Sequence, residues 1–144
     1  MLKKAFRMIA LALVIPIVAT VAARAQPAPE LLSIELNALN QNAAACQVYV
    51  VIDNVSEVAF AKFSTDLVLF DNDGLILKRL TTDFGRLRPN KIHVMSFVVD
   101  PLECAAVGRV VLNDVIDCEH DGSAGVDCID AIRLSHRGDV GFEK

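Results

Sequence analysis

The sequence reads CQVYVVIDN over residues 46–54, FSTDLVLFDNDG over 63–74, LILKRLTTDFGRLRPNK over 75–91 and IHVMSFVV over 92–99. These runs are rich in β-branched and aromatic residues, and turn-forming residues separate them. In the first run, the even positions from Cys46 to Ile52 are all apolar, which is the period of a half-buried strand. A corner follows at Asp71–Gly74, where the glycine supplies the positive φ of a hairpin turn.

We expect Asn40–Asn42 to form a turn, and residues 56–62 to form a connection whose Val58 and Phe60 fold back onto the core. A single helical turn at Ala105–Ala106 is the one local alternative to strand. The sequence therefore predicts an all-β fold, a two-sheet antiparallel immunoglobulin-like sandwich of about seven strands. The predicted strands are 32–37, 46–53, 63–70, 75–81, 92–99, 107–115 and 129–135.

The first 25 residues have the features of a cleavable signal peptide. Lys3 and Lys4 give a basic start, an apolar run follows over 8–18, and Ala23 and Ala25 precede the expected cleavage point. An uncleaved anchor is the alternative, but the apolar run is shorter than the roughly 20 residues that span a bilayer. The paired lysines, in place of paired arginines, favour the general secretory route to the periplasm or beyond.

The chain is expected to form one exported domain. We divide it into a signal peptide at 1–25, a flexible lead-in at 26–30, the sandwich at 31–136 and a polar C-terminal tail at 137–144. Cleavage leaves ten basic against eighteen acidic residues, a net charge of −8 where the full chain has −4. An acidic domain repels phosphate backbones and anionic membranes, so we expect neither nucleic-acid binding nor stable membrane insertion.

All four cysteines lie in the exported part, where an even count predicts two disulfides and three pairings are possible. The strand 107–115 separates Cys104 from Cys118 by roughly 25–30 Å. An antiparallel pair of strands 107–115 and 129–135 would place Cys128 beside Cys118. Because bonded cysteines need Cα atoms within about 7 Å, we predict the disulfides Cys46–Cys104 and Cys118–Cys128.

The middle of the chain resembles the secreted FxLYD-type β-sandwich modules. The matching features are a strand ending in Asn54, the corner Phe70–Gly74, the turn Leu87–Asn90 and a strand with Phe97 near its end. Asn90 stands where the family has glycine. The C-terminal part is similar to small uncharacterised exported proteins of Gram-negative bacteria. The resemblance implies an immunoglobulin-like sandwich and no particular activity.

Candidate chemistry is sparse. The Asp71–Gly74 corner departs from calcium-loop templates and is interpreted as a hairpin turn. A nucleophile setting such as G-x-S-x-G and a C-x-x-C redox pair are both missing from the sequence, so we expect no enzyme activity and no cofactor. The loop 119–127 carries possible ligands for an ion, but it lacks a paired-histidine motif and is interpreted as solvated. These residues are Glu119, His120, Asp121 and Asp127.

A small basic cluster, Arg86, Arg88 and Lys91, stands at one corner of the acidic domain. We hypothesise that the protein is a non-catalytic exported binding or accessory module that contacts another cell-envelope protein. The cluster and the 119–127 loop are the possible contact residues, with the cluster suited to an acidic partner. The alternative is a small secreted inhibitor, or a ligand- or metal-binding protein, that works through the loop.

Overall fold

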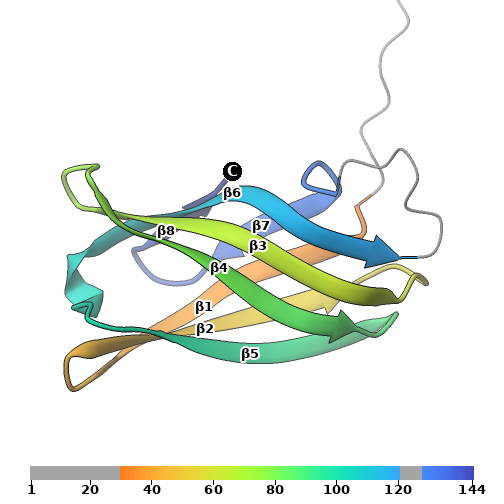
Figure 1. Ribbon diagram of the computed structural model, residues 1–144, viewed down its shortest axis with the longest axis horizontal. Coiled ribbons are helices and arrows are strands. Elements are labelled where there is room, and N and C mark those ends of the chain that lie inside the picture. Colours follow the sequence, from red (N-terminus) through yellow and green to blue (C-terminus); the bar gives the residue numbers. More distant parts are fainter. Residues whose placement is uncertain (1–29, 121–127) are drawn as a thin grey trace, which may run out of the picture.

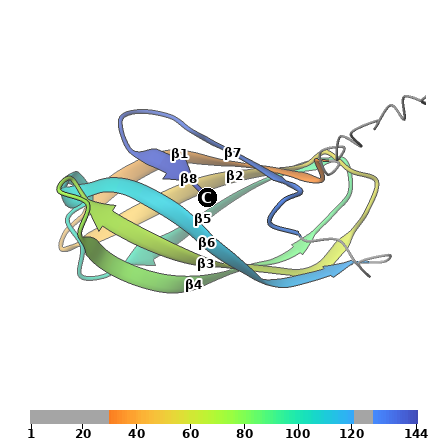
Figure 2. The ribbon, with the colours of Figure 1, turned by 90° about the horizontal axis from the view of Figure 1, so that it is seen from above.

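The computed structural model describes residues 30–120 and 128–144, and it is nearly all β (Figure 1). Two four-stranded sheets pack as a sandwich, in the orders β5-β2-β1-β7 and β4-β3-β6-β8. Figure 2 shows the two layers from above. The strands are β1 (Leu32–Asn42), β2 (Ala45–Asn54), β3 (Phe60–Asp71), β4 (Ile76–Leu87), β5 (Lys91–Val99), β6 (Val107–His120), β7 (Ile132–His136) and β8 (Gly141–Glu143), with a 3₁₀ turn η1 (Cys104–Ala106) before β6.

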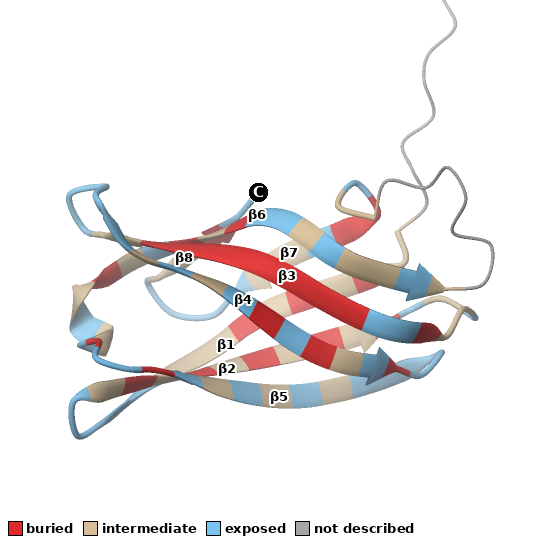
Figure 3. Ribbon diagram, viewed as in Figure 1, coloured by how far each residue is buried: buried red, intermediate tan, exposed pale blue. Residues whose placement is uncertain are grey.

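The alternation that predicted the strands is visible in their burial. Along β2, every second residue from Cys46 to Asn54 is buried, and β1 buries Leu32, Ile34 and Leu36 in the same way (Figure 3). These side chains meet Phe60, Phe63 and other apolar residues of the second sheet in one core. The sandwich prediction is therefore confirmed. Among the residues that the structure describes, no helix is long and apolar enough to cross a membrane.

Several strands are longer than the sequence pattern predicts. The prediction of a turn at 40–42 is wrong. Strand β1 continues to Asn42, and the chain reverses at Ala43, which has φ 50°. The third strand begins at Phe60 within the expected connection, and Phe60 itself is buried as expected. The fourth strand runs on to Leu87, beyond the end at residue 81 that the sequence predicts. The predicted helical turn is confirmed as η1.

The C-terminal part differs most from the prediction. Strands 107–115 and 129–135 were expected to pair antiparallel, but β6 lies beside β3 while β7 lies parallel to β1 in the other sheet. The segment 137–144, expected as a polar tail, contains β8, which lies parallel to β6 and buries Phe142. The described residues therefore form eight strands, with two parallel pairs in an otherwise antiparallel sandwich.

Both predicted disulfides are present. Cys46 of β2 is bonded to Cys104 of η1 with a Cα separation of 5.0 Å. Cys118 of β6 is bonded to Cys128 at a Cα separation of 6.5 Å. Because β7 follows Cys128 in the first sheet and Cys118 belongs to the second, this bridge ties the two layers together, although the strand pairing used to predict it does not exist.

Candidate functional site

The two possible contact regions predicted from the sequence, the basic cluster and the 119–127 loop, come together at one end of the sandwich. Strands β4 and β6 end there and β5 begins, at the right of Figure 1. An open hollow of about 600 Å³ lies there. Arg86, from the basic cluster, and Glu119 and His120, from the predicted loop, line this hollow. Glu119 and His120 are the last residues of β6 and not loop residues. Asp121 and Asp127, the remaining acidic candidates, fall outside the described residues.

The basic cluster is exposed and makes no ion pair with the described residues. Among the described residues, the arginines at 79, 109, 133 and 137 each pair with a carboxylate, whereas Arg86 and Arg88 form no ion pair. Lys91 is likewise exposed and without an ion pair in the part of the chain that the structure describes. We call Arg86, Arg88 and Lys91 the basic corner. On an acidic protein, cations left without a carboxylate partner are available to another molecule.

Hydrogen bonds hold the backbone of the basic corner in place. Asn54 is fully buried, and its Nδ2 donates to the carbonyl oxygens of Arg88, at 3.1 Å, and Val58, at 2.7 Å. The backbone N–H of Arg88 donates to Nε2 of His93 at 3.1 Å. The corner is thus fixed to β2 and β5 from both sides, so that its cations project from a rigid support.

The turn at 87–90 has Asn90 at the position where FxLYD-type modules have glycine. Asn90 has φ 49°, in the left-handed region that glycine and asparagine tolerate best. Its backbone N–H donates to the carbonyl of Ser56 at 3.0 Å. Ser56 also donates from its hydroxyl and its backbone N–H to Oδ1 of Asn54. The geometry of this turn therefore depends on the buried amide of Asn54.

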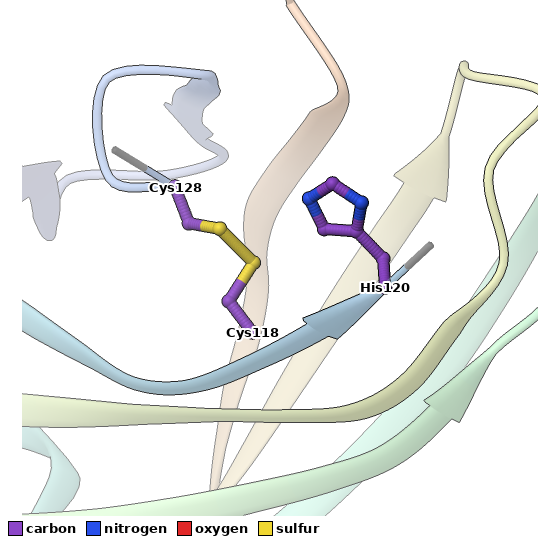
Figure 4. A group of neighbouring side chains, drawn as sticks. All are labelled: Cys118, His120 and Cys128. Atoms are coloured by element: carbon purple, nitrogen blue, oxygen red, sulfur yellow. A yellow bond between two sulfur atoms is a disulfide. The ribbon is translucent and has the colours of Figure 1, made fainter. Parts of the chain in front are cut away.

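His120 lies beside the Cys118–Cys128 disulfide (Figure 4). Its ring contacts the ring of Phe60 edge-on, with centroids 5.0 Å apart. A nitrogen of His120 and the two sulfur atoms of Cys118 and Cys128 lie within 4.8 Å of one another, a spacing that would suit a metal ion. Both sulfurs are bonded to each other, so neither is a thiolate that could bind one. In the disulfide state the two cysteines therefore cannot serve as metal ligands.

Asp117, also on β6, is a charged residue whose partners lie within the protein. It accepts a hydrogen bond from the hydroxyl of Ser64 and pairs with Lys62 at 3.0 Å. The Ser64 hydroxyl and the Lys62 ammonium hold the pKa of the Asp117 carboxyl below its usual value. Its charge is therefore already satisfied within the protein.

The Asp71–Gly74 corner is a hairpin turn, as expected. The Gly74 backbone N–H donates to the Asp71 carbonyl at 3.2 Å, and Gly74 has φ 83°. Oδ1 of Asp71 accepts the backbone N–H groups of Asp73 and Leu75. The carboxylate thus supports the turn itself.

Sequence reasoning missed an ion pair between a buried carboxylate and an exposed arginine on the outer face of the second sheet. The Asp66 side chain is only 4% exposed, and Arg79 donates to both of its oxygens at distances from 2.6 to 3.0 Å. Asn113 of β6 donates to the same carboxylate. The Arg79 guanidinium lowers the pKa of the Asp66 carboxyl. The available signal was an acid in the middle of the predicted strand FSTDLVLF, directly before four apolar residues.

Comparisons with known proteins support the fold. No protein-family model matches the chain, and no curated protein matches it. The FxLYD-type resemblance is therefore not confirmed. A member of the DUF1425 family from Shewanella sp. pv-4 gives a TM-score of 0.40 at 10% identity over 55% of this chain and 71% of its own. The structure of IrmA from Escherichia coli has a TM-score of 0.54 at 14% identity, covering 72% of this chain and 89% of its own, and it shows that the two chains share a β-sandwich fold.

Proposed function

We propose that this chain is a non-catalytic exported protein that binds an acidic surface of another cell-envelope protein through its basic corner. The observation that carries the proposal is the pair of arginines, Arg86 and Arg88, that lack a carboxylate partner while the other described arginines have one. Arginine is favoured at binding surfaces because its planar guanidinium can hold a carboxylate with two hydrogen bonds.

The surroundings of the basic corner support binding rather than catalysis. Nε2 of His93 accepts the Arg88 backbone N–H, and the His120 ring packs on Phe60, so both histidines near the corner have structural contacts. The hollow beside Arg86 is open and would admit a protruding side chain of a partner. The rigid support from Asn54 lowers the ordering cost of binding, because the corner is already in place.

Export is part of the proposal. The basic, apolar and small-residue segments at the N-terminus supply the expected signal, and two disulfides are typical of proteins that fold in an oxidising compartment. We place the protein in the periplasm or outside the cell, with no cofactor.

Affinity capture from envelope extracts tests the binding role. The exported protein is compared with the double variant Arg86→Glu/Arg88→Glu and with the control Arg109→Glu/Lys144→Glu. The control reverses two exposed cations near β8, roughly 30 Å from Glu119 along β6. We expect the wild type and the control to recover the same partner and the corner variant to lose it. Equal recovery by all three proteins, or no partner for the wild type, would refute the proposal.

The hollow favours one alternative, a small ligand bound by Arg86, Glu119 and His120. A ligand that binds only the folded state raises its melting temperature. A panel of divalent metals and small carboxylates, scanned by thermal unfolding, distinguishes the two functions. A rise in melting temperature that is lost on His120→Ala would favour the ligand-binding function over the protein partner.

A further inference from the structure

Strand β5 is a long and largely apolar sheet edge. Within the described part of the chain it pairs with β2 alone, over all nine residues and without a register shift. Its outer face carries Ile92, Val94 and Val98, which are 57%, 70% and 60% exposed, with Ser96 between the two valines. Figure 1 shows β5 along the lower margin of the sandwich. Backbone groups at such an edge can pair with a further strand.

The other sheet edges carry features that discourage strand addition. In the described residues, β7 has five residues and β8 has three, so each edge is short. Strand β4 is long, but Lys78, Arg79, Asp83 and Arg86 lie along it and its pairing with β3 has three register shifts. Strand β5 has a single charged residue, Lys91, and that residue is its first. An apolar sheet edge without such features is available to pair with another strand.

We propose that β5 pairs antiparallel with β5 of a second copy of this chain, about a two-fold axis at Met95. In that register Ile92 faces Val98 of the second copy and Val94 faces Ser96. Each outer-face residue therefore meets another outer-face residue, as antiparallel pairing requires. Paired residue numbers add up to an even number, such as 92 and 98, so residues on one face of β5 pair with residues on the same face of the second copy. This holds whichever alternate residues direct their backbone groups outward.

The ends of the strand also suit a second copy. In this register Lys91 lies opposite Val99 of the second copy and next to Asp100, so opposite charges approach at both ends of the pair. Two-fold symmetry makes both contacts at once, because the same patch meets itself. The two sheets that contain β5 become one eight-stranded sheet. Arg86 and Arg88 lie outside β5 and remain free for the proposed partner.

Sedimentation equilibrium of the disulfide-bonded exported protein, from about 1 to 500 µM, tests the pairing. We expect a reversible dimer. Val94→Lys places a charge at the centre of the edge and should raise the dimer Kd about tenfold or more. The control Ile116→Lys, at a position 53% exposed on β6, should leave the Kd unchanged. Thermal unfolding and the far-ultraviolet spectrum establish that both variants fold.

A monomer at all concentrations would overturn the proposal, as would a dimer that Val94→Lys leaves intact or Ile116→Lys abolishes. The register has its own test. Met95→Cys should form a covalent dimer on oxidation, because Cβ atoms of facing residues lie about 4.5–5.5 Å apart. Ile92→Cys should not, because its two copies lie roughly 20 Å apart. A reversed result would exclude the axis at Met95. Partner capture by Val94→Lys separates this proposal from the binding role, which should survive in the variant.

Discussion

Asn54 is the residue whose replacement tests the account of the corner most severely. Its amide is fully buried and takes part in four hydrogen bonds, as donor to Val58 and Arg88 and as acceptor from the backbone and hydroxyl of Ser56. Each such bond contributes about 1 kcal/mol net, and unpaired buried partners cost more. We expect Asn54→Ala to lower the free energy of unfolding by about 3–4 kcal/mol, a large part of the stability of a small domain.

Urea titration measures this loss as a lower midpoint with an unchanged slope. Within the described residues, the Asn37 amide hydrogen-bonds only to the partly exposed carboxylate of Glu35. The control Asn37→Ala removes this bond and should cost less than about 1 kcal/mol. Asn54→Asp keeps an acceptor for Ser56 but sets a carboxylate oxygen against two carbonyls. The loss of unfolding free energy in this variant should be smaller at pH 5 than at pH 8, because protonation of the new carboxylate restores a hydrogen-bond donor. A cost below about 1 kcal/mol for Asn54→Ala would refute the reasoning.

Three further outcomes are expected in the same assay. Gly108→Ala should lose about 1–3 kcal/mol, because its Cβ would lie 2.7 Å from the Asp71 carbonyl oxygen, whereas Gly141→Ala, with 3.7 Å of room, should change little; equal effects would contradict the packing. Thr65→Val should gain about 1 kcal/mol, since the buried hydroxyl has no hydrogen-bond partner among the described residues; a loss would show that the hydroxyl is satisfied. The Arg79 hydrogen bonds lower the pKa of Asp66, so the pair stabilises the fold above about pH 4, and this stabilisation is lost as the pH falls through the pKa of Asp66 in the folded state. Arg79→Gln should flatten the dependence of the unfolding free energy on pH. An unchanged pH profile would exclude the pair as its source.

Much of the sandwich could be predicted because its strands carry local signals. Period-two alternation in 46–54 and turn residues at Asp71–Gly74 each specify their own geometry. The disulfide pairing followed in part from the length of strand 107–115, which keeps Cys104 away from Cys118. It also used an antiparallel pairing of 107–115 with 129–135 that the structure does not contain. The strand β8 could not be predicted, because three residues are too few for a periodic pattern and its neighbour β6 is distant in sequence.

The site was predictable in its parts but not in its assembly. Arg86 and Arg88 were visible as a basic cluster, and Glu119 and His120 as a polar segment. Arg86, Glu119 and His120 meet around one hollow because β4 and β6 flank β3 in the second sheet, and no local pattern encodes that order. Asn54 was recognised only as the end of a strand, since a buried asparagine and an exposed one look alike in a sequence.

Site-specific photo-crosslinking in living cells tests the central claim most directly. A photoreactive residue replaces Arg88 at the basic corner in one protein and Arg109, far from it on β6, in another. Both are expressed with the native N-terminus so that export proceeds. The account predicts that position 88 yields a discrete crosslinked cell-envelope protein with an acidic surface, and that position 109 yields none. No crosslink at position 88, or the same products at both positions, would contradict it.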